Sequence, residues 1–319
     1  MNQGLFVLPI PGCAISSERD LISGIVQGSC MGPLLFLIYI NDVIECLPSE
    51  CSCKLFADDL KLYSVASIIE NSAIVVQLSL DKLYAWSVKW QLTISHKKCH
   101  VMQLGHCSDS RFHIGDNAID TVSSTRDLGI QVSANLTFSA HIKAIVTKAH
   151  ARANLIHKCF LSKDSHTLTK AFTVYVRPLL EYASIVWSPY LVKDIRYVES
   201  VQRKFTKKIA CLRNLDYADR LKILNLESLE TRRLRFDLLY TYKMLFGFIH
   251  IDCESMFKCN STSITRGHSY KLYATTSRVN LRHYFFCNRV VATWNSLPLS
   301  ADNLSSYNRF KTFLYRIQL

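Results

Sequence analysis

The sequence predicts an α+β protein in which a small antiparallel sheet with packed helices is followed by an all-helical, basic region. Three observations support this class. Two short apolar runs flank an acidic pair in residues 54–63, which is typical of a β-hairpin. After Ser139 the hydrophobic residues recur at helical spacing. The net charge is negative before about this point of the chain and positive after it. With 49% hydrophobic and 20% charged residues, the 319-residue chain can bury a core and form two domains.

The charge is divided unevenly along the chain. Residues 1–140 hold 9 basic and 13 acidic side chains, whereas residues 141–319 hold 29 basic and 12 acidic ones. The net charges are therefore −4 and +17, within a total of +13. A strongly basic second part favours a polyanionic partner such as nucleic acid, although the solvated faces of an ordinary basic protein give the same count.

No segment has the pattern of a membrane anchor or a secretion signal. The apolar run at residues 33–40 is too short to span a bilayer, and residues 1–15 lack a basic n-region. We therefore expect an intracellular protein, nuclear or cytoplasmic, whose twelve cysteines are reduced thiols. The Cys and His residues within 99–107 match no common zinc-finger spacing, and buried or incidental side chains are the simpler interpretation.

The first part of the chain alternates helices with short strands. Residues 1–22 carry no clear pattern, and a glycine-rich turn then leads through Pro33 into residues 34–44. Proline at a first helical position and the length of the run favour a buried helix there. A hairpin over 54–63 and an amphipathic helix over 74–90 follow. Further short strands are expected at residues 92–94, 101–104, 111–114, 118–122 and 128–132.

The second part contains only helical patterns. Residues 142–156 place their apolar side chains on one face. A helix over residues 165–187 should kink or break at Pro178, because proline removes a backbone donor. Residues 193–213 form the clearest amphipathic helix, and a further helix spans residues 229–246.

Asp58 and Asp59 are the most specific local feature. Adjacent carboxylates at a hairpin tip repel each other unless a cation neutralises them. Mg²⁺ takes hard oxygen ligands and prefers a few carboxylates together with substrate phosphates. In two-metal phosphoryl transfer, one ion activates the attacking hydroxyl and the other stabilises the leaving oxygen. By itself the pair is far more typical of a plain exposed turn, so its context decides.

Three ordered motifs surround the acidic pair. They read GIVQGSCMGPLLF at residues 24–36, LFADDLKLY at residues 55–63 and WSVKWQL at the start of residues 86–102. They resemble, in that order, the template- and nucleotide-positioning motif, the catalytic F-A-D-D hairpin and the next palm motif of reverse transcriptases from non-LTR (LINE-type) retrotransposons. The jockey and chicken-repeat-1 kind is most similar. The likeness continues weakly through residues 125–129, 138–141, 178–187 and 288–298.

The resemblance implies an RNA-directed DNA polymerase with an α+β palm followed by a helical thumb. Its partners would be an RNA template, a DNA primer and deoxynucleotides, with two Mg²⁺ ions as cofactors and no membrane. The implied division is a lead segment over residues 1–22, a partial palm over 23–135, a basic thumb over 136–250 and a C-terminal helical region over 251–319.

The matched motifs also imply roles for single residues. Asp58 and Asp59 would be the catalytic metal ligands. Lys98 would lie near the triphosphate, where a cation offsets charge developing on pyrophosphate, although a plain surface lysine fits equally. The template and nucleotide pocket would be shaped by Gln27, Gly28 and Ser29.

Three departures from the family pattern bear on activity. The family has a further aspartate on a strand before the Gln-Gly-Ser motif, whereas Asp20 is the sole aspartate before Gln27 and has no strand-like context. Val26 stands where the family usually has proline, and residues 95–97 replace Asn-Pro-Asp. We therefore expect the fingers domain and the aspartate strand to be absent. The isolated chain should then not polymerise unless a fingers or endonuclease portion is supplied upstream or in trans.

A non-catalytic nucleic-acid-binding remnant is the alternative. In this interpretation the helix at residues 193–213 grips a primer–template backbone by neutralising phosphates, without reading sequence. The basic side chains that project from its polar faces are Arg203, Lys204, Lys207 and Lys208.

Overall fold

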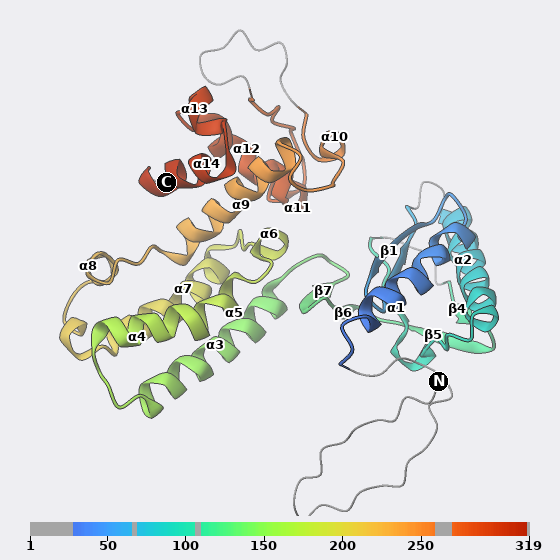
Figure 1. The fold of residues 1–319 in the computed structure, drawn as a ribbon, viewed down its shortest axis with the longest axis horizontal. Helices are drawn as coiled ribbons and strands as arrows, with labels where there is room; N and C mark the ends of the chain where they lie inside the picture. The colour runs from blue at the N-terminus through green and yellow to red at the C-terminus, as the bar shows by residue number, and fades with distance from the viewer. Residues whose placement is uncertain (1–27, 66–68, 106–109, 259–269, 318–319) are drawn as a thin grey trace, which may run out of the picture. The chain divides into compact units, whose positions relative to one another are not determined.

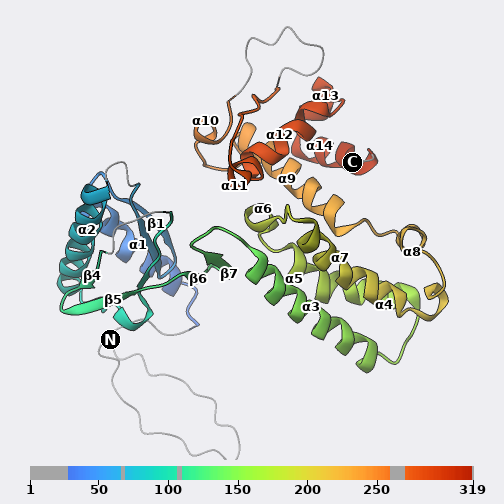
Figure 2. The ribbon, with the colours of Figure 1, turned by 180° about the vertical axis from the view of Figure 1, so that it is seen from behind.

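A computed structural model describes residues 28–65, 69–105, 110–258 and 270–317. The chain divides into two compact units, unit 1 over Met1–Ser123 and unit 2 over Ser124–Leu319. Figures 1 and 2 show their elements from opposite sides. Small sheets combine with many packed helices, so the predicted α+β class is confirmed.

Unit 1 contains two small sheets. Strands β1 and β2 form an antiparallel hairpin, and a second sheet has the order β3-β5-β4. In that sheet β4 runs antiparallel to β5 and β3 runs parallel to it. The elements are α1 (Gly32–Ile40), a 3-10 helix (Asn41–Cys46), β1 (Ser52–Phe56), β2 (Asp59–Tyr63), α2 (Ile69–Lys89), a 3-10 turn (His96–Lys98), β3 (His100–Val101), β4 (Phe112–Ile114) and β5 (Asn117–Thr121).

The core of unit 1 is built on one face of α2. Leu83 and Trp86 pack with Ile40 and Val43 of the preceding helical segment. The indole Nε1 of Trp86 donates a hydrogen bond of 3.1 Å to the carboxylate of Asp42, which satisfies a polar group that burial would otherwise leave unpaired. A second cluster joins α2 to the three-stranded sheet through Leu80, Phe112, Ile114 and Ile119.

The helix α1 differs from the buried helix that the sequence predicts. It begins at Gly32 with Pro33 in its first turn, as expected, but Ile40 is its one buried residue. The segment is apolar on every side, whereas only the side with Phe36 and Ile40 joins the core cluster. The prediction of burial was therefore wrong for the other side chains, which are exposed at Leu34, Leu35, Leu37 and Ile38.

The strand predicted at residues 92–94 is also wrong. The chain leaves α2 through Gln91, whose φ is 55°, and the amide of Leu92 donates to the carbonyl of Ser87 at 2.9 Å. This bond closes the helix end and turns the chain away from the sheet. Leu92 and Ile94 then pack against the hairpin cluster without strand pairing.

In the described part of unit 2, a hairpin comes first and the remaining elements that span several residues are helices. The strand predicted over residues 128–132 is replaced by two paired strands, because Leu128 and Gly129 adopt φ values of 43° and 86° and form a tight turn. The elements are β6 (Ser124–Asp127), β7 (Ile130–Ser133), α3 (Ser139–Cys159), α4 (Ser165–Ala171), a π-helix (Phe172–Val176), α5 (Arg177–Glu181), α6 (Ser184–Trp187), α7 (Val192–Lys207), a 3-10 turn (Ala210–Leu212), α8 (Tyr217–Ile223), α9 (Leu229–Leu245), α10 (Cys253–Met256), α11 (Asn280–His283), α12 (Phe286–Ser296), α13 (Ala301–Leu304) and α14 (Tyr307–Arg316).

Two apolar clusters hold unit 2 together. The first packs α3, α4, α5 and α7 around Phe172, Trp187 and Phe205, and these helices lie side by side in Figures 1 and 2. The second packs α9, α12 and α14, where the rings of Tyr242 and Phe310 stack with centroids 4.7 Å apart. The side chains of Trp187 and Phe310 are fully buried.

Two predicted helix features have different outcomes. The break at Pro178 is confirmed, because a π-helical turn separates α4 from α5 and Pro178 lies in the first turn of α5. The helix predicted over residues 193–213 ends earlier, at Lys207. Ile209 is extended, with φ −72° and ψ 120°, and a separate 3-10 turn follows.

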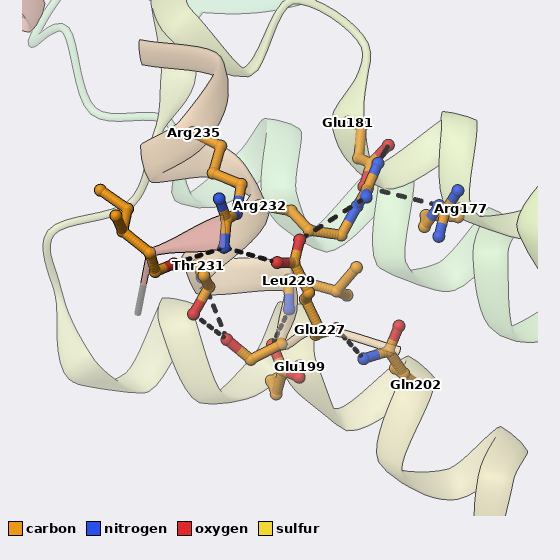
Figure 3. Close-up of polar contacts among 11 residues, drawn as sticks. Arg177, Glu181, Glu199, Gln202, Glu227, Leu229, Thr231, Arg232 and Arg235 are labelled. Carbon is orange, nitrogen blue, oxygen red and sulfur yellow. Dashed lines mark hydrogen bonds and ion pairs between the residues drawn. The ribbon is translucent and has the colours of Figure 1, made fainter. Parts of the chain in front are cut away.

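A buried polar network joins α7 to α9 (Figure 3). The carboxylate of Glu199 accepts a hydrogen bond of 2.9 Å from the amide of Leu229 and another from the hydroxyl of Tyr217. The amide nitrogen of Gln202 donates to the carbonyl of Glu227 at 2.9 Å. These bonds satisfy the N-terminal end of α9 and fix the orientation of α7.

Candidate functional site

The hairpin of β1 and β2 places Asp58 and Asp59 at its tip. Phe56 pairs with Asp59, so Ala57 and Asp58 form the two-residue turn. Ala57 takes a left-handed φ of 52°, as tight hairpin turns require. Both aspartates are exposed to solvent. The predicted hairpin with an acidic tip is therefore confirmed as a structural feature.

The side chains of β1 and β2 alternate between a partly buried and an exposed face, and the buried face anchors the hairpin to the core. On one face, Leu55, Leu60 and Leu62 are partly buried against the core cluster of α2. The opposite face is exposed and includes Phe56, whose side chain is 65% exposed. Because side chains alternate in a strand, the apolar face anchors the hairpin and leaves its turn projecting into solvent.

The two carboxylates are suitable for Mg²⁺ but do not form a complete site. Each offers hard oxygen ligands, and their mutual repulsion favours a bound cation. Within the described residues, however, no group of three His, Cys, Asp or Glu side chains is arranged to hold a metal ion. A two-ion site needs more ligands than this pair supplies.

Gly28 and Ser29 of the Gln-Gly-Ser motif lie just before α1. Gly28 has φ 86°, and a Cβ placed on it would meet nothing within 4 Å, so backbone conformation and not crowding requires glycine there. The hydroxyl of Ser29 accepts a hydrogen bond of 3.2 Å from the amide of Met31 and thereby shapes the turn before the helix. Gln27 and Asp20 lie outside the described residues.

Lys98 lies on the 3-10 turn after α2 and is exposed. Its amide donates to the carbonyl of Ser95 at 2.9 Å, which fixes the backbone of this turn. Four residues earlier, Ile94 packs in the same cluster as Leu55 and Leu60 of the hairpin. The segment that carries Lys98 is therefore anchored to the core beneath the acidic tip.

The helix α7 carries the predicted basic side chains on its exposed surface. The other side is apolar and buried, through residues such as Val201 and Phe205. The guanidinium of Arg203 lies over the ring of Tyr217 at 4.6 Å, and the Nζ of Lys208 donates to Asn154 of α3 at 2.7 Å. The predicted residues Arg203, Lys204, Lys207 and Lys208 are all exposed; Lys208 is the C-cap of α7, and Lys193 and Arg196 nearer its start are exposed as well.

The positive charge of α7 influences a histidine on the neighbouring helix α3. Burial lowers the pKa of His150, and the positive charges of Lys204 and Lys208 lower it further. The ring of His150 lies 3.3 Å from the hydroxyl of Ser200 on α7. Neutral histidine is favoured there, as expected next to a concentration of cations.

Sequence reasoning gave the arginines at the start of α9 no role beyond opening a helix. Arg233 and Arg235 are only 3% and 4% exposed. Arg235 forms an ion pair of 2.8 Å with Glu227, and Arg232 pairs with Glu181 of α5 (Figure 3). Buried cations need such partners, and a partner on a distant helix, such as Glu181, gives no signal in the local sequence.

Comparison with known proteins identifies a family whose matched region includes the hairpin. The reverse transcriptase (RNA-dependent DNA polymerase) family matches residues 6–132. This span contains the acidic hairpin, the turn at Gly28 and Ser29, and Lys98. The class of protein defined by unit 1 is therefore a reverse transcriptase.

Among curated proteins, the similar polymerases come from mobile elements. The chain is 24% identical over 204 residues to the probable RNA-directed DNA polymerase from transposon X-element of Drosophila melanogaster, covering 61% of this chain and 22% of that protein. It is 24% identical over 216 residues to the RNA-directed DNA polymerase from mobile element jockey of Drosophila funebris, covering 64% and 24%. An uncharacterized protein of Caenorhabditis elegans is 30% identical over 146 residues, covering 44% of this chain and 73% of that protein.

The chain belongs to the reverse transcriptases of non-LTR retrotransposons, as its motifs predict. It spans less than a quarter of the length of the two named polymerases. The alternative of a non-catalytic remnant gains no support from relatives that are named as polymerases. No solved structure matches the chain. None of the helices in the described ranges is both long and apolar enough to cross a membrane.

Proposed function

We propose that this chain contributes the palm and thumb of an RNA-directed DNA polymerase, which copies an RNA template by adding deoxynucleotides to a DNA primer. The proposed palm spans residues 23–135, the thumb 136–250 and a helical C-terminal region 251–319. The observation that carries this proposal is the exposed pair Asp58 and Asp59 at a hairpin tip, inside the segment that the reverse transcriptase family matches.

In this proposal Asp58 and Asp59 bind Mg²⁺. Their carboxylates are adjacent, exposed and anchored by the apolar face of the hairpin, so a cation that neutralises both relieves their repulsion. A further carboxylate must complete the site. We propose that it comes from a fingers-containing polymerase segment, either upstream in a longer chain or supplied in trans.

The neighbouring motif residues would position the substrates. Gly28 offers backbone without a side chain at an exposed turn, where a template or nucleotide can approach closely. Gln27 and Ser29 would flank it in the same pocket. Lys98, exposed on a turn anchored beneath the hairpin, would offset the negative charge of the triphosphate and the departing pyrophosphate.

The helix α7 would hold the primer–template duplex. The exposed side chains of Arg203, Lys204, Lys207 and Lys208 form a cationic surface at the C-terminal end of a helix whose opposite side is buried. Such a surface neutralises phosphates without reading bases, and the counterions released make binding strongly dependent on salt.

Primer extension tests the proposal. The purified 319-residue chain is incubated with an RNA template, a labelled DNA primer, deoxynucleotides and Mg²⁺ or Mn²⁺. The reaction is repeated with an added fragment that precedes the matched region in a related polymerase. We expect extension only with the fragment, because only then is the carboxylate set complete. The Asp58→Asn variant should slow it by about 10²–10³-fold.

Two outcomes would count against this proposal. Extension by the chain alone, sensitive to Asp58→Asn, would show that no added carboxylate is needed. Extension at the wild-type rate in the Asp58→Asn and Asp59→Asn variants would remove the hairpin from the catalytic site. Binding of an RNA–DNA hybrid, measured in the same preparations, distinguishes an inactive site from a chain that does not bind.

A further inference from the structure

A cleft of about 570 Å³ lies within unit 2, away from the helix α7 and its basic side chains. Its walls come from three stretches far apart in the sequence: the π-helix with α5 and α6, the middle of α9, and α14 (Figure 1). A volume of this size suits one nucleotide or a similar small group. The proposed polymerase function assigns no role to it.

The cleft is lined by more positive than negative charge. Arg177, Lys243 and Lys311 line it, together with one carboxylate, that of Glu181. Glu181 is already engaged, because both of its oxygens accept hydrogen bonds from Arg232. For Lys243 and Lys311, no carboxylate of the described residues lies within ion-pair distance. Two lysines on the wall are therefore available to an anion.

Aromatic rings make up much of the remaining wall. Tyr182 and Tyr315 are the most accessible, at 60% and 44% exposed. The guanidinium of Arg235 lies 4.9 Å from the ring centre of Tyr315 and supports that ring from within the protein. The Nζ of Lys243 lies 4.9 Å from the ring centre of Tyr307, so cation and ring are neighbours on the wall.

We propose that this cleft binds single-stranded nucleic acid, with one nucleotide seated inside it. Lys243 and Lys311 would bind its phosphates, and the base would stack on Tyr315. Stacking rings next to cations is the combination that holds single strands without sequence readout, because every base has an aromatic face and every linkage a charge. The strand would be the unpaired template or the displaced strand, which the duplex-binding surface of α7 does not engage.

An acidic peptide is the competing occupant, since lysines attract carboxylates as well as phosphates. The accessible rings favour the nucleic acid, because an acidic peptide has no flat group to place on them. Removing a lysine should therefore weaken the binding of both occupants, whereas removing an aromatic ring should weaken the binding of nucleic acid only.

The test uses the full chain and a fluorescein-labelled single-stranded RNA of about twelve nucleotides, within the range of site sizes known for single-strand binders. Fluorescence anisotropy gives its affinity for the wild type, for Lys243→Gln with Lys311→Gln, and for Tyr315→Leu. Tyr315→Phe keeps the ring and is its matched control. Lys158→Gln with Lys222→Gln removes the same charge from exposed positions that do not line the cleft.

We expect Tyr315→Leu to weaken binding by about tenfold, the lower part of the range for a lost base stack, while Tyr315→Phe binds like the wild type. The cleft lysine variant should lose more affinity than its charge-matched control. All cleft variants should keep the wild-type affinity for an RNA–DNA hybrid, which separates this inference from the proposal for α7. A matching DNA oligonucleotide shows whether the strand is RNA or DNA.

Several results would overturn the inference. Equal losses in the cleft and control lysine variants would mean that only general charge attracts the strand. Equal binding by Tyr315→Leu and Tyr315→Phe, with both folded by circular dichroism, would remove the stacking ring. Displacement of the RNA by polyglutamate as readily as by unlabelled RNA would assign the cleft to an acidic peptide. Displacement by a nucleoside monophosphate at the same concentration would assign it to a free nucleotide.

Discussion

Units 1 and 2 differ in how completely they bury their apolar side chains. In unit 2 the side chains of Trp187, Trp294 and Phe310 are fully buried. In unit 1, α1 leaves Ile38 66% exposed, and the hairpin leaves Phe56 65% exposed. Large apolar surface on a folded unit commonly marks a place where other protein or ligand packs. Unit 1 therefore offers such a surface on α1 and the hairpin, and unit 2 exposes single apolar side chains such as Leu161 and Phe248.

The acidic pair of unit 1 also differs from the buried ion pairs of unit 2 in its exposure to solvent. Unit 1 holds Asp58 and Asp59 exposed at a turn, where repulsion is not relieved by a partner cation from the described residues. Unit 2 buries charges in pairs, such as Asp237 with Arg289, whose closest atoms are 2.8 Å apart. Paired, buried charges serve the fold, whereas unpaired, exposed ones are available for function.

The largest expected effect is on the stability of unit 2. Phe310→Ala removes a fully buried ring that contacts Tyr242 and Trp294, and the cavity should cost about 3–5 kcal/mol. Ile38→Ala, at an exposed position of α1, should cost within about 0.5 kcal/mol. Urea unfolding followed by circular dichroism measures both. Similar losses in the two variants would contradict the contrast between the units.

The second expected effect concerns the acidic hairpin. In a polymerase completed by an added fragment, Asp58→Asn should reduce the rate of primer extension by about 10²–10³-fold, the cost of removing one strong charge-stabilising group. Asp42→Asn is a matched control, because Asp42 accepts the indole hydrogen bond of Trp86 and lies away from the hairpin turn. It should affect stability, with extension per folded molecule unchanged. Equal rate losses would indicate that Asp58 acts through folding.

Features set by local chemistry could be predicted from the sequence. The hairpin with Asp58 in its turn follows from alternation and turn residues, and the break at Pro178 follows from the missing amide. The hairpin of β6 and β7 was missed, since Leu128 is not a residue that signals a positive φ.

Features that depend on distant partners could not be predicted. The exposure of α1 was missed because apolar composition shows that a helix can be buried, not that another element covers it. The cleft of unit 2 brings Tyr182, Lys243 and Tyr315 together from three separate helical segments, and no local pattern links them. The candidate metal ligands were accessible to sequence reasoning because they are adjacent in one hairpin.

A smaller effect is expected from the basic surface of α7. Neutralising all four side chains, Arg203, Lys204, Lys207 and Lys208, to glutamine should weaken binding of an RNA–DNA hybrid by about 10–100-fold at moderate salt. The slope of log affinity against log salt should become shallower by up to about 0.9 for each phosphate that the variant no longer neutralises. Anisotropy measured across a salt series gives both quantities. An unchanged slope would exclude this surface from backbone binding.

The smallest expected effect is the pH dependence of stability that arises from the buried Glu199, and it tests whether buried charge in unit 2 serves the fold. Burial raises the pKa of Glu199, outweighing the opposing hydrogen bonds from Tyr217 and the amide of Leu229. The folded chain then binds more protons than the unfolded one, so Glu199 makes stability decline as pH rises from its usual pKa of 4.5 toward the raised value.

Glu199→Gln removes this titration while keeping an acceptor for Leu229. Urea unfolding at a series of pH values should therefore show a shallower decline in stability above pH 4.5 than in the wild type. The exposed Glu230→Gln, on the same network's helix α9, should leave the decline as it is. A loss of stability below pH 4.5 in the wild type that Glu199→Gln lacks would mean that the carboxylate is stabilised when charged. In that case the attraction of Arg233 for the charged Glu199 carboxylate would outweigh the cost of burying it.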